Sequence, residues 1–249
     1  MSRFKILLVT LLTSLVLLSN LAFAMTAEEI MNQVDEYHHL KSAKVESEMI
    51  ITKGNRKLVK KMSSLIKGSK LGMTEFTNPR DRGSKFLKRG DDLWMFFPDA
   101  EDIVKISGHM LEQGMMGSDF SYKDMMESAK LTDLYDFKIL GEKEYQGRSC
   151  YLIEGIKKEG KDASYYRRVD WVDKERYVPL KEELYAQSGR LLKIMETKKV
   201  DKIDGRWFAT HQVIDNKLKR GTETEYRVNS IEFDADIPDN SFSLRNLRR

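Results

Sequence analysis

The chain has 249 residues, of which 33% are charged and 41% hydrophobic, and its formal net charge is +4. Lysine and arginine are interspersed with acidic residues along the whole length, which argues against a nucleic-acid-binding protein, because such proteins concentrate positive charge in one patch. Cys150 is the only cysteine, so the fold has no internal disulfide and must be held by its core. Its place in the apolar run 150–153 predicts a buried structural residue rather than a nucleophile.

Residues 1–24 have the pattern of a secretory signal peptide. Arg3 and Lys5 precede an apolar run over 6–18, and Ala22 and Ala24 are small residues at the positions that signal peptidase reads. A retained membrane anchor is the alternative, since the segment is nearly long enough to span a bilayer. The small-residue exit favours cleavage after Ala24 and export to the periplasm. Met25 stands where a lipoprotein would have cysteine, so we expect no lipid anchor. No break in composition divides residues 25–249, which we expect to form one domain.

A helix is predicted at the start of the mature chain, followed by strands. Thr26 and Glu29 have capping-box spacing, and Ile30, Val34 and Tyr37 follow at helical intervals. The period then changes to two, and short polar turns recur at regular spacing. The predicted strands lie over 43–52, 57–67, 71–77, 85–88, 92–97, 102–105, 135–140, 150–157, 165–172, 178–185, 191–200, 207–216 and 223–233. This pattern predicts a mainly β fold (α+β), with a meandering antiparallel sheet that curls or closes.

One segment, residues 107–130, departs from the strand pattern. Ser121 and Asp124 predict a capped helix over 122–129, and glycines at 108, 114 and 117 predict a flexible approach to it. Five of the thirteen methionines lie in this segment: Met110, Met115, Met116, Met125 and Met126. Methionine repacks around ligands of differing shape, so the segment has two interpretations. It is either an adaptable lid over a cavity or a plug at the end of a barrel core.

Reactive motifs are lacking. The sequence has no nucleophile elbow, no phosphate-binding glycine loop and no spacing of metal ligands. The histidines are His38, His39, His109 and His211. His38 and His39 are adjacent at a helix end, so their side chains do not converge, and His109 and His211 lack a carboxylate or cysteine at ligand spacing. We therefore predict a protein that is not an enzyme and that uses no metal and no cofactor.

Four segments carry a resemblance to a known family: 88–98 (KRGDDLWMFFP), 117–122 (GSDFSY), 171–181 (WVDKERYVPLK) and 237–242 (IPDNSF). With them the chain resembles the outer-membrane lipoprotein-sorting proteins, in an uncharacterised branch of the LolA/LolB-like superfamily. The resemblance implies an unclosed antiparallel β-barrel wrapped around a few helices, with an apolar cavity between them. It favours the lid interpretation, and the candidate ligand-binding residues are Trp94, Phe96, Met110, Met115, Met116, Phe120, Met125 and Met126.

The resemblance also implies a role. A LolA-like protein without an anchoring cysteine is expected to be a periplasmic carrier that accepts lipidated proteins or lipids and passes them toward the outer membrane. Its expected partners are this cargo, an inner-membrane transporter and an outer-membrane receptor, and no nucleic acid. The alternatives are an envelope module that senses lipids or lipoproteins and regulates a partner, or an accessory protein of an export pump.

Overall fold

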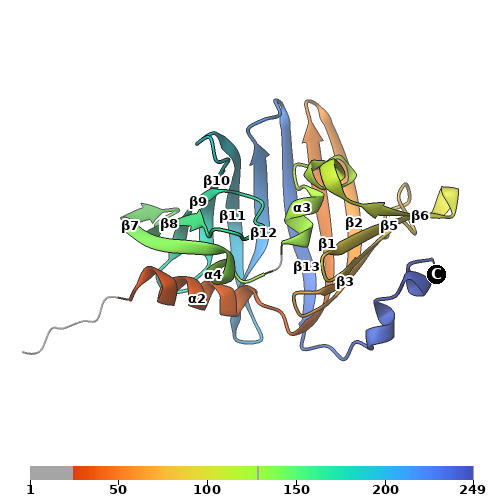
Figure 1. The fold of residues 1–249 in the computed structure, drawn as a ribbon, viewed down its shortest axis with the longest axis horizontal. Coiled ribbons are helices and arrows are strands. Elements are labelled where there is room, and N and C mark those ends of the chain that lie inside the picture. The colour runs from red at the N-terminus through yellow and green to blue at the C-terminus, as the bar shows by residue number, and fades with distance from the viewer. Residues whose placement is uncertain (1–24, 128, 249) are drawn as a thin grey trace, which may run out of the picture.

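The computed structural model describes residues 25–127 and 129–248 (Figure 1). The predicted signal peptide and its cleavage site lie almost entirely outside the described residues. The strands of the described part are β1 (Ser42–Lys53), β2 (Arg56–Lys67), β3 (Leu71–Phe76), β4 (Lys85–Arg89), β5 (Asp92–Phe97), β6 (Asp102–Ile106), β7 (Tyr135–Tyr145), β8 (Arg148–Lys157), β9 (Arg167–Asp173), β10 (Pro179–Tyr185), β11 (Leu191–Ile203), β12 (Arg206–Asn216) and β13 (Thr222–Phe233).

The helices are few and short. They are α2 (Ala27–His38), α3 (Tyr122–Met126), α4 (Leu131–Leu134) and α5 (Leu244–Leu247), with 3₁₀ turns at Pro98–Ala100, Gly108–Glu112, Met115–Gly117 and Asp239–Ser241. Figure 1 shows α2 and α4 beside β7 and β8, whereas α3 lies over the strands of the other half of the sheet. None of the helices in residues 25–127 and 129–248 is long and apolar enough to cross a membrane.

The described strands form one antiparallel sheet of thirteen strands, in the order β6-β5-β4-β3-β2-β1-β13-β12-β11-β10-β9-β8-β7. Strands β1–β6 form one meander and β7–β13 form another, and the two are joined where β13 pairs with β1. The predicted turn at Gly54 joins β1 to β2, whose pairing runs from Lys53↔Arg56 to Ser42↔Lys67. The predicted mainly β, unclosed antiparallel architecture is confirmed.

The two halves of the sheet meet at a short seam. β12 pairs with β13 over four residue pairs only, from His211↔Arg227 to Ile214↔Thr224. β13 pairs with β1 along nearly its whole length, from Thr222 to Phe233. Side chains bridge the unpaired part of the seam, because the rings of Phe208 and Phe233 lie edge to face with centroids 5.9 Å apart. We refer to β1–β6 with β13 as the first half and to β7–β12 as the second half.

Alternation along the strands divides the apolar residues of the first half between two faces. Leu93 and Met95 of β5 belong to one core cluster, together with Phe76 and Phe86. The intervening side chains face the other way, as the pleat requires. They pack against residues 235–247 after β13 in a second cluster: Met73, Leu87, Phe96, Ala235, Ile237, Phe242 and Leu247.

Helix α2 forms as the sequence predicts. The Thr26 hydroxyl accepts from the Glu29 backbone N–H at 3.2 Å, and the Glu29 carboxylate accepts from the Thr26 N–H at 2.7 Å, so the capping box is complete. Ile30 and Val34 are buried against Ile153 of β8 and neighbouring residues. Helix α2 thereby covers the second half of the sheet.

Three elements end several residues away from their predicted ends. The helix predicted over 122–129 has only one turn, since α3 ends at Met126 and Glu127 already has extended backbone. Strands β7 and β11 continue to Tyr145 and Ile203, well past the predicted ends at 140 and 200. Pairing extends them, because β7 and β8 form a hairpin that closes at Tyr145↔Arg148 and β11 and β12 form one that closes at Ile203↔Arg206.

Candidate functional site

The concave face of the sheet encloses two adjoining cavities beneath the segment 107–127, which we call the cover segment. One cavity has a volume of about 310 Å³ and the other about 420 Å³. Both volumes lie in the range of about 300–1,000 Å³ that is typical of ligand pockets. The cavities adjoin each other, because six residues line both: Ile66, Gly68, Ser69, Phe120, Met195 and Gln212.

The smaller cavity, the apolar chamber, lies between the first half of the sheet and the cover segment. Its walls are mostly aliphatic and aromatic, and only one of its lining residues, Lys88, is charged. The sheet supplies Val45, Met49, Met62, Leu65, Ile66, Leu71, Ile214 and Tyr226, and the cover segment supplies Met115, Phe120 and Met125. Such walls suit a hydrocarbon chain, because removing apolar surface from water is favourable.

The cover segment is a closed, hydrogen-bonded loop rather than the flexible approach that its glycines predict. The Met115 N–H donates to the Phe120 carbonyl at 2.7 Å, and the Tyr122 N–H donates to the Gln113 carbonyl at 3.1 Å. Gly114 is required for close approach, since a Cβ there would stand 2.1 Å from the Ser118 carbonyl oxygen. The glycine therefore permits a tight turn, which the sequence pattern alone did not distinguish from mobility.

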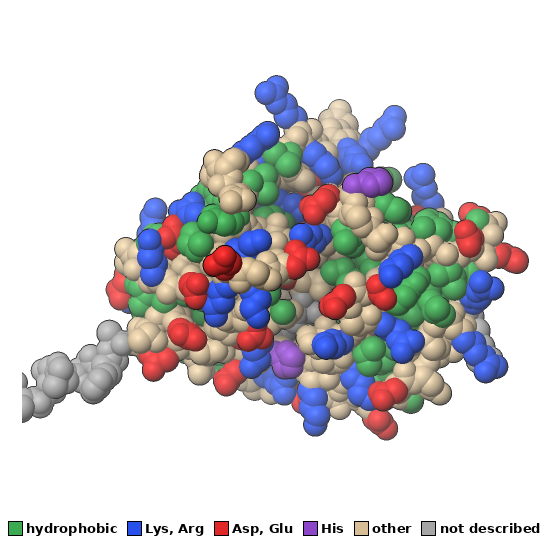
Figure 2. All heavy atoms as spheres, viewed as in Figure 1, with side chains coloured by type: hydrophobic (Ala, Val, Ile, Leu, Met, Phe, Trp, Pro, Cys, Tyr) green, Lys and Arg blue, Asp and Glu red, His purple; other side chains and the backbone are tan. Residues whose placement is uncertain are grey.

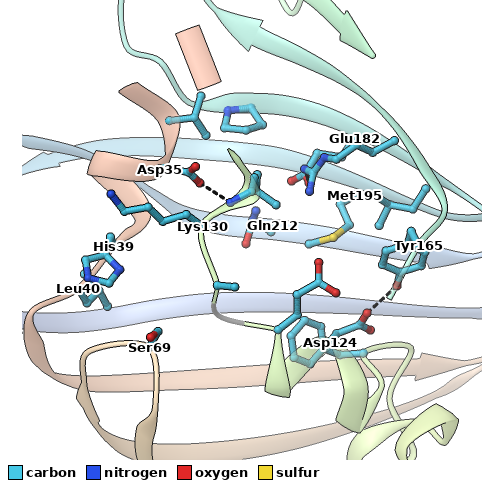
Figure 3. Close-up of a pocket in the computed structure, with 18 of the residues that line it drawn as sticks. Asp35, His39, Leu40, Ser69, Asp124, Lys130, Tyr165, Glu182, Met195 and Gln212 are labelled. Atoms are coloured by element: carbon cyan, nitrogen blue, oxygen red, sulfur yellow. Dashed lines mark hydrogen bonds and ion pairs between the residues drawn. The ribbon is translucent and has the colours of Figure 1, made fainter. Parts of the chain in front are cut away.

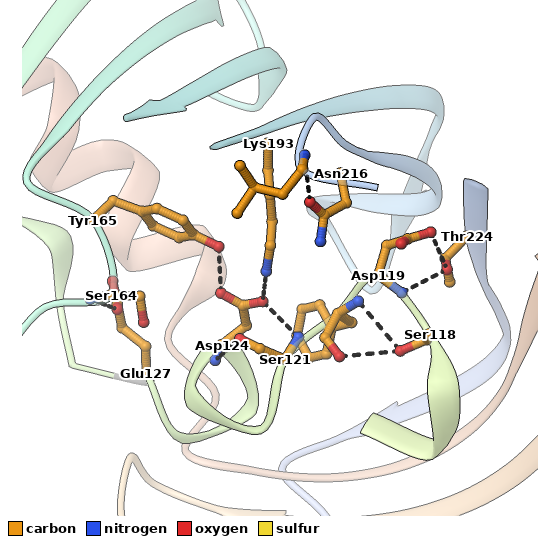
Figure 4. A network of polar contacts seen from close by, with 12 residues as sticks. Ser118, Asp119, Ser121, Asp124, Glu127, Ser164, Tyr165, Lys193, Asn216 and Thr224 are labelled. Carbon is orange, nitrogen blue, oxygen red and sulfur yellow. Dashed lines mark hydrogen bonds and ion pairs between the residues drawn. The ribbon is translucent and has the colours of Figure 1, made fainter. Parts of the chain in front are cut away.

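A buried carboxylate attaches one end of the cover segment to β13 (Figure 4). Asp119 is 1% exposed, and its oxygens accept from the hydroxyl groups of Thr222 at 2.9 Å and Thr224 at 3.1 Å. The Asp119 N–H in turn donates to the Thr224 hydroxyl at 2.9 Å. Lys219 adds a hydrogen bond to the Ser118 carbonyl at 3.2 Å. Since Asp119 is buried with all these partners, this attachment is firm.

A second carboxylate attaches α3 to the other half of the sheet. Asp124 accepts from the Tyr165 hydroxyl at 2.6 Å and forms an ion pair with Lys193 of β11 (Figure 4). It also completes the capping box of α3, accepting from the Ser121 N–H at 2.7 Å. Burial, together with the adjacent charge of Asp124, raises the pKa of Tyr165 far above its ordinary value, so the phenol stays a hydrogen-bond donor. The cover segment thus joins both halves across the seam.

The larger cavity, the polar chamber, lies over the second half of the sheet. Figure 3 shows Asp35, Asp124, Tyr165 and Glu182 around it, contributed by α2, the cover segment, the loop before β9, and β10. In its wall the Arg168 guanidinium binds Asp170 through two hydrogen bonds of 2.7 and 2.9 Å and Glu182 through one of 2.5 Å. These contacts are buried, because the side chains of Arg168 and Asp170 are 6% and 0% exposed.

Solved structures of bacterial proteins share this architecture. A DUF1329 family protein from Desulfovibrio piger is 25% identical, with a TM-score of 0.81 over 89% of this chain and 97% of that one. A structure described as an outer membrane lipoprotein-sorting protein domain, from Vibrio parahaemolyticus, is 26% identical, with a TM-score of 0.78 over 90% and 98%. A LolA superfamily protein from Nitrosomonas europaea, 23% identical, shares the fold with a TM-score of 0.75 over 90% and 100%.

A family model described only as an uncharacterized protein matches residues 68–249. The chain belongs to the family that this model describes, and its fold is that of the LolA-like outer-membrane lipoprotein-sorting domains. None of the curated proteins matches its sequence.

Three of the candidate residues in this LolA-like chain line a cavity. Met115, Phe120 and Met125 form part of the roof of the apolar chamber. Met110, Met116 and Met126 are half-buried against the same core cluster without lining either chamber. The lid and plug interpretations therefore each describe part of the segment: Met115 is 4% exposed and fills the core, whereas Met125 is half-buried at the chamber wall.

The placement of Trp94 and Phe96 in the cavity was wrong. Both side chains pack on the opposite face of β5, against the cluster that contains the residues after β13. Leu93 and Met95, one position away, are the β5 residues on the cover-segment side. Because the side-chain period of a strand is two, an error of one residue changes the face.

Sequence reasoning missed the residues of the polar chamber. Arg168 and Asp170 are two charged residues within a strand that is otherwise largely buried, and their spacing puts both side chains on one face. Charges on the inner face of a strand are rarely buried unless they are paired, so this spacing was an available signal. Their partner Glu182 lies on the next strand and was not distinguishable from the exposed charges around it.

The histidines and Cys150 show no reactive arrangement. His211 contacts Glu225 at 3.1 Å, and Glu225 is also held by Arg227, so this group is a cross-strand ion network. Within residues 25–127 and 129–248, no three His, Cys, Asp or Glu side chains are grouped so that they could hold a metal ion. Cys150 is fully buried, as predicted. That the chain is not an enzyme stays a prediction.

Proposed function

We propose that this chain is a carrier of the bacterial envelope that binds the acyl chains of lipoproteins, or other lipids, in the apolar chamber and passes them toward the outer membrane. The observation that carries the proposal is the apolar chamber itself, roofed by Met115, Phe120 and Met125. The similarity to the lipoprotein-sorting domain from Vibrio parahaemolyticus supports it.

The energetics of lipid transfer fit this arrangement. An acyl chain in water costs about 0.8 kcal/mol for each exposed methylene, so a carrier must shield the chain from water. A carrier must also release its cargo, which requires a roof that separates from the sheet. The cover segment is a separate loop that packs on the sheet through Met115 and Tyr122. Polar contacts also hold it, at Asp119, Asp124 and the Met126 carbonyl, which accepts from Lys88 at 2.7 Å. Breaking the polar contacts costs little net free energy, because water replaces the lost hydrogen bonds, whereas exposing a continuous apolar core would cost more.

The cellular setting is part of the proposal. We infer that residues 1–24 are removed after Ala24, that residues 25–249 form a single domain in the periplasm, and that its partners are an inner-membrane transporter and an outer-membrane receptor. Sequencing of the exported protein from its N-terminus should begin at Met25. A retained apolar segment would replace a diffusing carrier with an anchored protein.

Filling the apolar chamber from the sheet tests the proposal directly. Gly72 of β3 lines the chamber, and an added Cβ would meet its nearest neighbour, the Lys88 Cβ, at an ordinary 3.7 Å. Gly72→Leu should therefore place a side chain in the chamber without strain and remove a strand glycine that weakens the sheet. We expect the affinity for the neutral fluorophore N-phenyl-1-naphthylamine to fall at least tenfold, while the melting temperature stays the same or rises.

Met73→Leu is the matched control. Met73 is the next residue along β3, but it faces the cluster on the other side of the sheet, and the exchange conserves volume. This variant should bind the fluorophore like the unmodified protein. If Gly72→Leu also retains full affinity while folded, the apolar chamber is not the binding site and the proposal fails.

A further inference from the structure

The polar chamber lies where the polar end of a bound amphiphile would lie. It shares the residues Ile66, Phe120, Met195 and Gln212 with the apolar chamber, so one ligand can occupy both. Its entrance includes His39 and Lys130, which are exposed, and its inner wall includes Arg168 and Glu182, which face away from solvent. A ligand with its chain in the apolar chamber would therefore place its headgroup among these charged side chains.

The inner wall of the polar chamber carries more negative than positive charge. Arg168 is a single cation shared between two carboxylates, those of Asp170 and Glu182. Asp124 is balanced by Lys193, so this pair adds no net charge. The Arg168 group therefore leaves one negative charge without a cation in a buried setting.

Two further carboxylates at the chamber are held by neutral donors. Asp35 is 4% exposed and accepts from the backbone N–H groups of Leu131 and Thr132 at 2.8 and 2.9 Å. Glu127 accepts from the Ser164 N–H at 2.6 Å. Within the described part of the chain, neither forms an ion pair with lysine, arginine or histidine, and the nearby Lys130 is solvent-exposed. Hydrogen bonds from N–H groups stabilise a carboxylate but do not cancel its charge.

The protonation of Glu182 reflects this excess. Burial raises the pKa of Glu182 to about 7, and the charges of Asp170 and Glu127 raise it against the opposing effect of Arg168. A buried site with surplus negative charge gains most from a cation that arrives without a full hydration shell. An ammonium group tethered to an alkyl chain meets that condition, because burial of the chain draws the group into the chamber.

We propose that the polar chamber is a headgroup site and that the preferred ligand is a lipid-like amphiphile with an ammonium group at its polar end. The inference rests on the proposed function, since it assumes that the chain of the ligand occupies the apolar chamber. It adds a selectivity that the apolar chamber alone cannot supply: amphiphiles with a carboxylate or another anion at that end are disfavoured by Glu127, Asp170 and Glu182.

Three single-chain amphiphiles of equal length test this selectivity. Titration calorimetry of the mature protein with dodecylammonium, dodecanol and dodecanoate, each below its micelle concentration at pH 8, compares a cationic, a neutral and an anionic headgroup on one chain. We expect dodecylammonium to bind at least tenfold more tightly than dodecanoate, with dodecanol between them. Tetramethylammonium, which has no chain, should bind at least a hundredfold more weakly than dodecylammonium.

Substitutions in the chamber wall assign the preference to named carboxylates. Glu182→Gln keeps an acceptor for Arg168 but removes the charge, and it should cut the ratio of dodecylammonium to dodecanoate affinity at least fivefold while leaving dodecanol unchanged. Glu127→Gln, on the cover segment, should act in the same direction, and it keeps the test open if Glu182→Gln does not fold. Glu183→Gln is the matched control, because Glu183 is held by Lys181 and Tyr185 and does not line the chamber.

The outcomes separate this inference from the proposed function. Equal affinity for the three dodecyl compounds, or a preference for dodecanoate, overturns the headgroup site while leaving the carrier function in place. Binding of tetramethylammonium as tight as that of dodecylammonium would show a cation site unrelated to lipid, which also overturns it. Failure of all three dodecyl compounds to bind removes both the headgroup site and the carrier function.

Discussion

The two halves of the sheet have different interiors although they belong to one sheet. The first half, β1–β6 with β13, buries an apolar cluster on its concave face, with Phe76, Phe86 and Leu93 among its members, and two lysines, Lys60 and Lys88, are buried beside it. The second half, β7–β12, buries Arg168 with its two carboxylates on the same side of the sheet. The halves are paired over four residue pairs, and the cover segment spans them. One fold thus encloses a hydrocarbon-like and a charged compartment side by side.

The difference teaches that the apolar half alone meets the needs of a lipid carrier, whereas the charged half requires a separate explanation. Buried ion pairs seldom add stability compared with apolar residues of similar size, because both charges lose their hydration. The Arg168 group differs from the buried pair of Lys60 and Asp81 in the first half because Arg168 and Glu182 line a chamber, whereas Lys60 and Asp81 line neither. Figure 2 shows no such grouping of charge at the surface. Basic and acidic side chains are intermixed over the face in view.

The largest effect should come from breaking the charged group in the second half. Arg168→Met leaves Asp170 and Glu182 buried without a cation, and we expect a loss of about 3–5 kcal/mol in the free energy of unfolding. Urea denaturation of the mature protein measures it. Lys44→Met is the control, because Lys44 and Glu232 form an exposed pair, with side chains 48% and 61% exposed, and the change should stay within about 0.5 kcal/mol. A loss for Arg168→Met as small as that for Lys44→Met would mean that the group is not buried in solution.

A second pair of substitutions distinguishes a core residue of the cover segment from a residue that lines the apolar chamber. Met115 is 4% exposed within the core cluster, so Met115→Ala should cost about 2–3 kcal/mol, at the lower end of the usual range because a loop can partly collapse. Met125 lines the apolar chamber and is half-buried, so Met125→Ser should cost under about 1 kcal/mol yet weaken binding of N-phenyl-1-naphthylamine several-fold. The free energy of unfolding and the affinity for the fluorophore are measured on both variants. Equal destabilisation by the two would make the whole cover segment a plug.

The extent to which the sequence predicted these halves depends on how local each feature is. The capping boxes at Thr26 and Ser121 and the hairpin at Gly54 follow from spacings of a few residues, and all three are present. Three of the candidates in the cover segment, Met115, Phe120 and Met125, line the apolar chamber, because a methionine-rich segment between strands has few places to bury itself. Trp94 and Phe96 were misplaced because composition identifies a strand without fixing which face is inward.

The polar chamber was beyond prediction for a different reason. Its residues come from α2, the cover segment, β9 and β10, and the pairing of β13 with β1 brings the first half of the sheet beside the second. That pairing joins residues about 190 positions apart, such as Ala43 and Phe233, and no local pattern encodes it. Arg168, Asp170 and Glu182 themselves meet within the β9–β10 hairpin, where Asp170 is paired with Glu182, but the chamber beside them is completed by α2 and the cover segment.

The raised pKa of Glu182, in the second half, makes the stability of the folded protein depend on pH. Burial raises its pKa to about 7 in the folded protein, from the ordinary value of 4.5. Between these values the folded state holds a proton that the unfolded state has released, so stability should rise as the pH falls from about 7 toward 4.5. The charged groups nearest to it are Arg168 and Asp170 of β9 and Glu127 of the cover segment.

Glu182→Gln should remove about 2–3 kcal/mol of this pH dependence, measured as the difference in the free energy of unfolding between pH 5 and pH 8. Carboxylates with lowered pKa, such as Asp173, act in the opposite direction, but their contribution is lost mainly below their ordinary pKa of 3.8. Glu183→Gln is again the control and should leave the slope unchanged. An identical slope in Glu182→Gln would mean that Glu182 is ionised throughout this range.

The smallest effect should come from Cys150, which is an apolar element within the charged half. Its side chain is fully buried with Val169, Trp171 and Leu180, and its thiol donates a weak hydrogen bond to the Arg148 carbonyl at 3.5 Å. Cys150→Ala should therefore cost only about 1 kcal/mol and leave the affinity for N-phenyl-1-naphthylamine unchanged.

Thiol labelling at pH 7 tests the same placement in the unmodified protein. Burial raises the pKa of Cys150 to about 11, so the reactive thiolate is scarce and also shielded from solvent. Labelling by a maleimide should consequently proceed only as fast as the second half opens, and urea should accelerate it. Leu218→Cys in the Cys150→Ala background provides the comparison, because Leu218 is 52% exposed and a thiol there should react at once. If Cys150 reacts as fast as this surface thiol, the second half opens far more readily than its buried ion pairs allow, and the contrast between the two halves is then one of mobility as well as of charge.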